Sequence, residues 1–438
     1  MSGLKDFPHV NVIKVAIDID GTTVPMGTLA RETAEGHKQI YFEYDQAFID
    51  RGLEVSPVKL ELRAGAWAPD DAAPFDGLFG LFNDSLPDGW GRHLLDRRLE
   101  GKNINAKDLT ALDRLSFVGA TGMGALTYEA AEVFETPEGS DLDLDALSAD
   151  AERAQEEMDE ADIEKLQALQ GSSGGARPKI MIGRNAASGN LVEDFGKGLL
   201  KDFEPWLVKF RSKSNDHIHI GAEEYAYSLM ARACGIDMPD TMLLKGEKGR
   251  YFAVKRFDRT AAGRIHVHTA CGLLHASHRY ASIDYSKLLT LTSLLTRDKT
   301  HVVEMFRRMS FNVLARNRDD HTKNHAFQMS SKGVWTLTPA YDLTLSAGIN
   351  GEHTLAIAGE GAKPGWRHIA EEAKRASIPK GDADAIFQEV KSVVENWPAY
   401  AEQASLPEKR MSEIDYLLNA RGPKPKEDVE VGAPGPSP

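Results

Sequence analysis

The sequence has little cysteine, no long apolar run and no basic run. Only Cys234 and Cys271 occur among 438 residues, which is too few for a disulfide framework or a four-thiolate zinc site. No stretch approaches the 18 or so apolar residues of a membrane-spanning helix, and Lys5, Asp6 and Lys14 interrupt the first apolar residues. These absences predict a cytoplasmic protein that is neither secreted nor membrane-spanning.

Acidic residues are in excess, and one short segment holds most of that excess. The net charge is −14, and residues 141–165 hold eleven acidic residues against Arg153 and Lys165. We interpret this segment as a solvated helix or linker, with a charged docking surface as the alternative. A chain without a basic patch does not hold DNA by neutralising phosphates alone, so any contact with DNA requires a basic partner.

The length of the chain predicts more than one packed unit, because 438 residues exceed the size at which a single core stops growing. We expect an α/β unit over residues 1–140, a sheet-rich lobe over 141–280 and an all-helical lobe over 281–422. Residues 423–438 are rich in proline, glycine and charged residues, which predicts a disordered tail. The fold class expected is therefore α+β.

Residues 10–70 combine alternating apolar residues with turn signals, which predicts short antiparallel strands such as residues 58–62. Residues 15–24 also match the nucleophile motif of HAD phosphatases, in which Asp18 would be phosphorylated and Asp20 would act as acid or base. Asp20 and the glycine after it are, however, a strong hairpin signal. A HAD domain needs a parallel sheet, so the phosphatase is kept only as a remote alternative.

The most informative segment is residues 317–324, which follow a helical pattern. It contains D-x-x-x-x-N, the spacing of the kinase catalytic loop, where the aspartate accepts the substrate's hydroxyl proton and the asparagine binds Mg²⁺. Asp319 and Asn324 suit these roles. Residues 334–337 then read as a strand, and Asp342 follows where a kinase has its second metal-binding aspartate. An N-cap or surface loop is the alternative for the first motif alone.

Lys209 lies in the apolar strand pattern of residues 206–210, where a lysine is unfavourable unless it meets an anion. This is the place of the phosphate-binding lysine of kinases. The helix that follows presents Glu223 and Glu224, and one of them is expected to pair with Lys209. The alternative is an edge-strand lysine that guards against aggregation.

Taken together, these motifs resemble the HipA family of toxin kinases across nearly the whole chain. The matching stretches, in the order of the family, are residues 84–91, 122–126, 174–179, 256–259, 319–324 and 339–342. Several motifs in one order are far more specific than any one of them. The resemblance implies a HipA-like kinase fold that is remotely related to phosphoinositide-type kinases, with a nucleotide-binding lobe over residues 141–280 and the catalytic loop in the lobe after it.

The same resemblance implies ATP and Mg²⁺ as cofactors. Asp319 would be the catalytic base, and Asn324 and Asp342 would hold the metal. The residues it implies for ATP are Lys209, Glu224, Lys255, Phe257, Lys323 and the loop Ser172, Ser173, Gly174 and Gly175. Lys255 stands where the family has an acidic residue, which puts its side-chain contacts in doubt.

The loop of residues 172–175 is similar to the family's phosphate loop, whose serine is autophosphorylated in trans. Ser172 matches that serine best, and Ser173 is a close alternative. In the family this phosphate ejects the loop and silences the kinase. The resemblance therefore implies a kinase that switches itself off.

The resemblance also implies partners. They are a HipB-like helix-turn-helix antitoxin, through which the chain would reach DNA, and a protein substrate such as an aminoacyl-tRNA synthetase, with glutamyl-tRNA synthetase as the first expectation. The expected function is that of a serine/threonine kinase toxin of a type II toxin-antitoxin module. The alternative is an antitoxin-bound transcriptional co-repressor with weak catalysis.

Overall fold

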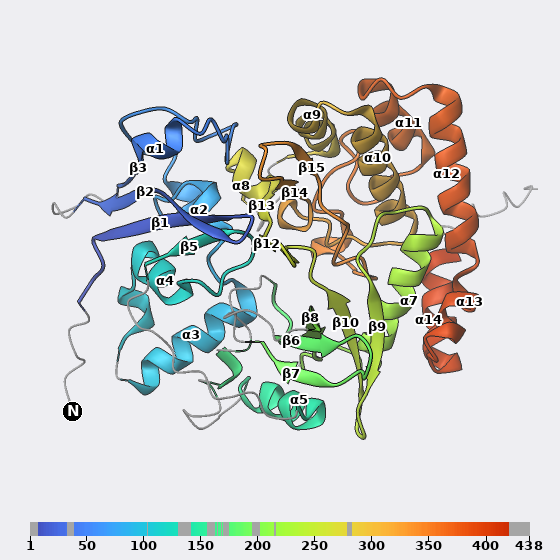
Figure 1. Cartoon of the computed structure of the whole chain (residues 1–438). Helices are drawn as coiled ribbons and strands as arrows, with labels where there is room; N and C mark the ends of the chain where they lie inside the picture. Colours follow the sequence, from blue (N-terminus) through green and yellow to red (C-terminus); the bar gives the residue numbers. More distant parts are fainter. Residues whose placement is uncertain are drawn as a thin grey trace, which may run out of the picture.

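The chain folds into antiparallel sheets and many helices (Figure 1). The computed structural model describes residues 8–32, 39–102, 104–129, 142–155, 163, 165–167, 169, 175–194, 202–213, 216–277 and 283–419. Over these residues the predicted α+β class is confirmed. The acidic segment is described only in part, and the predicted tail lies outside the described residues.

The first sheet has five strands in the order β4-β3-β2-β1-β5. Its strands are β1 (Val12–Ile19), β2 (Thr22–Arg31), β3 (Ile40–Tyr44), β4 (Ala66–Trp67) and β5 (Leu126–Tyr128). Asp20 and Gly21 join β1 to β2 with φ of 50° and 78°, the backbone that a two-residue hairpin turn requires. Both neighbours of β1 run antiparallel to it, so the HAD reading is wrong.

The strand predicted over residues 58–62 is also wrong, because this segment forms turns. Leu60 alone is fully buried there, and its carbonyl oxygen accepts a hydrogen bond from Tyr44 Oη at 3.2 Å. Four α-helices accompany the sheet: α1 (Gln46–Ile49), α2 (Gly80–Asn83), α3 (Gly89–Gly101) and α4 (Ala111–Val118). The described 3₁₀ turns of this region are Ala73–Phe75 and Ala106–Asp108.

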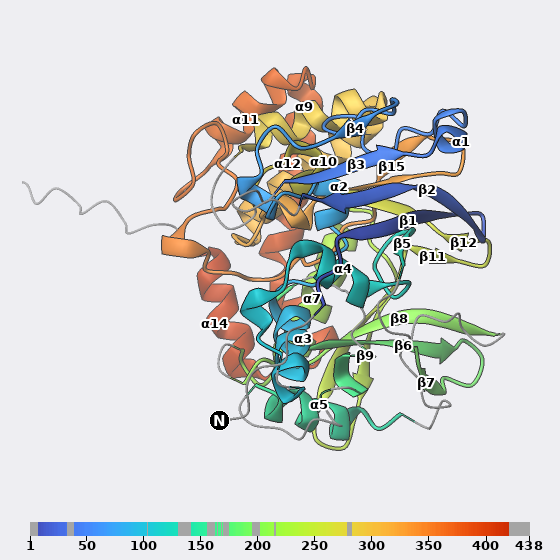
Figure 2. The same cartoon turned by 90° about the vertical axis from the view of Figure 1, so that its left-hand side faces the viewer.

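The second sheet has the order β7-β6-β8-β10-β9 and is also antiparallel. Its strands are β6 (Lys179–Asn185), β7 (Leu191–Glu193), β8 (Phe203–Lys209), β9 (Thr241–Lys245) and β10 (Arg250–Lys255). Side chains alternate along a strand, so Val208 faces the helix α5 (Leu144–Arg153) with its buried Leu147, while Lys209 faces the helix α7 (Ile220–Ala233). Within the acidic segment, α5 is thus an amphipathic helix packed on the sheet. Figure 2 shows this sheet below the first one.

Two smaller sheets follow, and one of them joins a strand that precedes α8 to two strands that follow α10. β11 (Arg259–Thr260) pairs with β12 (Gly263–Arg264), and β13 (His266–Thr269) pairs with β14 (Ala326–Met329), which pairs with β15 (Trp335–Leu337). The strand predicted at residues 334–337 is therefore present. The C-terminal lobe is not entirely helical, because β14 and β15 belong to it.

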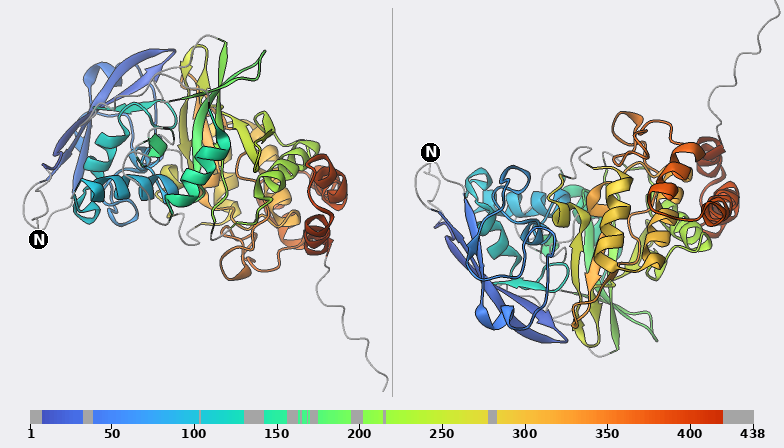
Figure 3. Two further views of the ribbon diagram at one scale, coloured as in Figure 1. Left: turned by 90° about the horizontal axis from the view of Figure 1, so that it is seen from below. Right: turned by 90° about the horizontal axis from the view of Figure 1, so that it is seen from above.

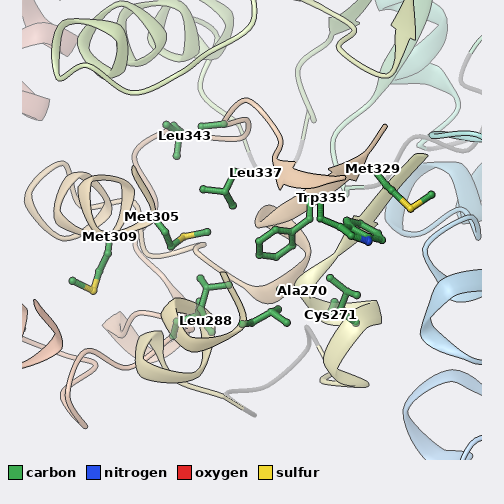
Figure 4. Packing of buried hydrophobic residues seen from close by; sticks show 14 of the residues in the cluster. Ala270, Cys271, Leu288, Met305, Met309, Met329, Trp335, Leu337 and Leu343 are labelled. Atoms are coloured by element: carbon green, nitrogen blue, oxygen red, sulfur yellow. The ribbon is translucent and has the colours of Figure 1, made fainter. Parts of the chain in front are cut away.

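The helix α8 (Ala270–Leu274) precedes this lobe. Helices build the rest of the lobe: α9 (Tyr285–Thr296), α10 (Lys299–Leu314), α11 (Trp366–Arg375), α12 (Lys380–Glu395), α13 (Trp397–Gln403) and α14 (Glu408–Asn419). Met305 and Met309 of α10 are buried with Leu288 of α9 and with Leu337 of β15 (Figure 4). This core fixes the end of α10, from which the catalytic-loop candidate emerges. Figure 3 shows α13 and α14 at the opposite end of the molecule from the first sheet.

The N-terminal unit, which we define as β1 to β5 with α1 to α4, packs directly on the rest of the chain. A Cβ atom on Gly80 of α2 would lie 2.0 Å from the carbonyl oxygen of Gly272 in α8, so two glycines let these backbones touch. Beside them, Asp84 Oδ2 lies 2.6 Å from His268 Nδ1, and His268 Nε2 lies 3.0 Å from Ser56 Oγ. Over the described ranges, no helix is long and apolar enough to cross a membrane.

Candidate active site

The catalytic-loop candidate starts where α10 ends. The carbonyl oxygen of Ala315 accepts a hydrogen bond from Tyr227 Oη of α7 at 3.0 Å, which ties the start of the loop to that helix. The Asp319 side chain is 62% exposed, as a group that must reach an external substrate requires. Asn324 Nδ2 donates to the carbonyl oxygen of Asp319 at 2.7 Å. The amide oxygen of Asn324 is then the atom left to face a cation.

Asp320, the residue after the candidate base, points into the protein and anchors the loop. Its carboxylate accepts hydrogen bonds from Tyr285 Oη and the Thr354 amide, each at 2.9 Å. His353 Nδ1 also lies 2.9 Å from it. Sequence reasoning missed this residue, since D-x-x-x-x-N does not distinguish a second aspartate that is structural.

Asp342 has a backbone φ of 55°, a region that costs free energy for a residue other than glycine and that clusters at functional sites. Its Oδ1 forms an ion pair with Lys209 Nζ, which joins the second sheet to the C-terminal lobe. Burial alone would raise the pKa of Asp342, but Lys209 and Lys179 hold it well below its ordinary value. Asp342 is therefore a carboxylate at neutral pH.

Lys209 is the centre of this charge cluster. Besides Asp342, it pairs with Glu224 of α7, whose Oε2 lies 3.1 Å from Nζ. Burial would lower the pKa of Lys209, and the two carboxylates raise it instead. Glu224 also pairs with Arg177, while its neighbour Glu223 turns away and binds Arg410 of α14 at 2.8 Å. The structure thus brings Glu224, and not Glu223, to the lysine.

Lys179 and Asp88 were not singled out from the sequence, although both lie in stretches that carry the resemblance. Lys179 begins β6 and is buried, and burial together with Lys209 lowers its pKa. Asp88 precedes α3 and forms an ion pair with Lys323 of the catalytic loop at 2.8 Å. A Cβ atom on Gly175 would lie 2.4 Å from Lys179 Nζ, so this lysine lies against the glycine. Lys179, Lys209 and Lys323 therefore bring positive charge to neighbouring positions from three segments of the chain.

Lys255 and Phe257, which the resemblance implies for ATP, separate in the structure. By the alternation of β10, Lys255 lies on the face opposite to Lys209, where it pairs with Glu204 at 2.7 Å. Its side chain is therefore not brought to the cluster. Phe257 stacks on Tyr341 with ring centroids 6.0 Å apart, and Tyr341 Oη donates to the carbonyl oxygen of Lys323.

Of the predicted phosphate loop, Ser172, Ser173 and Gly174 lie outside the described residues, and Gly175 is its described end. Among the described residues, no group of three or more His, Cys, Asp or Glu side chains forms a metal site. Asn324 and Asp342 nevertheless fit Mg²⁺, because this ion takes one or two protein oxygens and completes its shell with phosphate and water. The lysines fit the phosphates.

Comparisons with known proteins identify the family of this chain. The family model of the HipA N-terminal domain matches residues 17–129, and the model of the HipA-like C-terminal domain matches residues 171–397. The protein Y4dM of Sinorhizobium fredii, named as a candidate kinase, is 30% identical over 167 residues. That match covers 35% of this chain and 40% of Y4dM.

Two solved structures resemble the fold. One is a chain of the complex of HipA, HipB and operator DNA from the toxin-antitoxin system of Shewanella oneidensis MR-1, with a TM-score of 0.68, 17% identity, and coverage of 92% of this chain and 95% of that one. The other, the kinase CtkA of Helicobacter pylori, has a TM-score of 0.32 and 13% identity over 50% of this chain and 89% of its own, too low to support an argument. On the two domain matches, which together span most of its described length, the chain belongs to the HipA family.

Proposed function

We propose that the chain is an ATP-dependent serine/threonine protein kinase that uses Mg²⁺. The observation that carries the proposal is Lys209, held between Glu224 and Asp342 at the junction of the second sheet and the C-terminal lobe. A largely buried lysine with two acidic partners is the arrangement that phosphoryl transfer needs. The loop that holds the exposed Asp319 is linked to Asp342 by Asn317, whose Nδ2 donates to the carbonyl oxygen of Asp342 at 3.5 Å. Such a reaction depends on positioning and charge neutralisation more than on covalent chemistry.

Each residue then has one task. Asp319 accepts the proton of the substrate hydroxyl while that oxygen bonds to the γ-phosphorus and the bond to the departing ADP breaks. Asn324 and Asp342 hold Mg²⁺, which neutralises phosphate charge when bound. Lys209 binds ATP phosphate, and Glu224 keeps it in place. Phe257 offers an aromatic face at the adenine side, and Lys255 contributes through its backbone.

Replacing single carboxylates tests the proposal. Asp319→Asn and Asp342→Asn should abolish transfer of labelled phosphate from ATP and leave the protein folded, since neither side chain is part of the apolar core. Asp18→Asn is the matched control, because that carboxylate accepts hydrogen bonds from the backbone amides of Gly21, in its own hairpin, and of Arg264, in β12. Near-normal transfer in either site variant, with the fold verified by circular dichroism, would refute the assignment.

The loop of residues 172–175 is proposed as the switch of this kinase, with Ser172 as its autophosphorylated residue. A phosphate adds nearly two negative charges, which oppose ATP phosphates beside Lys179 and Lys209. Mass spectrometry after incubation with Mg²⁺ and ATP should find one phosphate on the peptide that contains Ser172 and Ser173, and none in Asp319→Asn. A phosphate at another position would contradict the switch.

We also propose the partners. The structure from Shewanella oneidensis that resembles this fold is a complex of HipA with HipB and operator DNA. This supports a HipB-like antitoxin as the partner of this chain. The substrate that we propose is a protein of translation such as an aminoacyl-tRNA synthetase. We also propose that the three structural units of the chain end near residues 140, 280 and 422. With a net charge of −14, the chain alone should bind duplex DNA weakly at physiological salt. Tight binding in a gel shift without the partner would count against this model.

A further inference from the structure

The N-terminal unit meets the proposed phosphate site at the first residues of α3. Asp88 is the N-cap residue of this helix, and within the described structure its side chain forms no capping hydrogen bond. An N-cap aspartate normally accepts from the first amides of its own helix. Here the carboxylate is directed elsewhere.

Asp88 contacts two segments that are far apart in the sequence. Its Oδ1 accepts a hydrogen bond from the Gly175 amide, and its Oδ2 lies 2.8 Å from Lys323 Nζ. Gly175 is the end of the proposed phosphate loop, and Lys323 stands next to the proposed metal ligand Asn324. One carboxylate thus fixes the spacing between the two segments that would hold the phosphates.

The backbone around Asp88 is built for this contact. The Trp90 amide donates to the carbonyl oxygen of Gly175 at 3.1 Å, so Gly175 is held on both sides. Gly89 has a φ of 40°, and a Cβ atom there would lie 2.6 Å from that same carbonyl oxygen. Only glycine lets the start of α3 approach so closely. Trp90 itself is buried in the core of the second sheet together with Ile180 and Val208.

We infer that Asp88 is a positioning residue of the nucleotide site, through which the N-terminal unit holds the end of the phosphate loop and the catalytic-loop lysine in register for ATP phosphates. This inference rests on the proposed function. Asp88 does not touch the nucleotide itself. Its carboxylate keeps the charge of Lys323 balanced and oriented in a site that water only partly reaches. The kinase site is therefore incomplete without the N-terminal unit.

The test compares ligands that differ in their phosphates. Binding of a non-hydrolysable ATP analogue with Mg²⁺, and of adenosine by competition, is measured on the full chain and on Asp88→Ala. We expect the dissociation constant of the ATP analogue to rise about tenfold, the size of one charge-assisted hydrogen bond. Adenosine affinity should not change, because adenosine has no phosphate for Lys323 or Gly175 to meet.

Two further variants serve as a milder change at the same residue and as a control outside the site. Asp88→Asn keeps an acceptor for the Gly175 amide and loses only the charge facing Lys323, so its effect should be intermediate, and it stays testable if Asp88→Ala does not fold. Asp96, which lies further along α3, forms an ion pair with Arg114 of α4 at 2.7 Å, and Asp96→Asn breaks this pair outside the site. It should leave both affinities unchanged.

The outcomes separate this inference from the proposed function. If the unchanged chain binds ATP, then equal affinity in Asp88→Ala, tighter binding of the analogue, or an equal loss of analogue and adenosine each overturns the positioning role. If the unchanged chain binds no ATP, the proposed function fails and the inference fails with it.

Discussion

The ion pair between Glu223 and Arg410 allows a quantitative prediction about how α14 supports α7. Arg410 donates from Nε and Nη2 to one oxygen of Glu223, at 3.0 and 2.8 Å. The Glu223 side chain is only 1% exposed, so removing the arginine leaves a buried charge without its main partner. Breaking one side of a buried pair costs about 3–5 kcal/mol of unfolding free energy. We expect this loss for Arg410→Ala at pH 8.

The loss should shrink as the pH falls. Burial already raises the pKa of Glu223, although Arg410 opposes the shift. The folded state therefore binds the proton of Glu223 more tightly than the unfolded state, and the stability this gives is present at low pH and lost as the pH rises through the folded pKa. Without Arg410 the folded pKa rises further. Arg410→Ala should then differ from the unchanged protein less at pH 5 than at pH 8.

Urea denaturation at the two pH values measures these differences. Glu413→Gln is the matched control, because Glu413 pairs with the same arginine at 3.2 Å but is 42% exposed, and such surface pairs contribute about 0–1 kcal/mol. The double variant Arg410→Ala with Glu223→Gln should recover most of the loss, since the unpaired charge at residue 223 is removed. Equal losses for Arg410→Ala and Glu413→Gln, or a loss that does not depend on pH, would refute the reasoning.

Two other predictions concern close packing and the catalytic loop. Gly80→Ala should lower the unfolding free energy, measured by urea titration, by about 1–3 kcal/mol, because the added Cβ would clash with Gly272. Gly381→Ala is the control and should not lower it, because nothing lies within 4 Å of a Cβ atom there. Asp320→Ala should cost about 3 kcal/mol or more, since it leaves several buried donors without their acceptor, and phosphate transfer should fall with it; unchanged stability would contradict the anchoring role.

The sequence was most informative where one segment carries its own signal. The turn at Asp20 and Gly21 and the apolar spacing of α10 each depend on local chemistry, so both were predictable. The D-x-x-x-x-N spacing is also local, because six consecutive residues of one loop hold it. The strand predicted at residues 58–62 was wrong because a contact from outside the segment decides its structure. Apolar residues do alternate there, but Leu60 is buried in a turn, and its carbonyl oxygen accepts a hydrogen bond from Tyr44. Pattern alone does not report such a tertiary contact.

The cluster around Lys209 shows what sequence could not provide. Arg177 and Lys179 come from one segment and Asp88 from another, and only the folded chain brings Arg177 to Glu224 and Asp88 to Lys323. Lys179 did carry a signal, since a lysine at the start of the apolar stretch from Ile180 to Ile182 is as unusual as Lys209 in β8. The same reasoning that selected Lys209 would have selected it.

Where two acidic residues are consecutive, the sequence does not show which of them faces the site. Glu223 and Glu224 are consecutive in α7, and Asp319 and Asp320 are consecutive in the loop. Neighbours on a helix point about 100° apart, so Glu223 and Glu224 face different surroundings. Glu224 meets Lys209, while Glu223 is held by Arg410 of α14.

The loop divides its two aspartates in the same way, with Asp319 exposed and Asp320 buried among donors. Glu223 and Asp320 are the members with scaffold partners, so their loss should be seen first in stability. The member that faces the cluster has its partners in the site, so its loss should be seen first in nucleotide binding or transfer. Stability and activity measured side by side for Glu223→Gln and Glu224→Gln therefore separate two roles that are indistinguishable in the sequence.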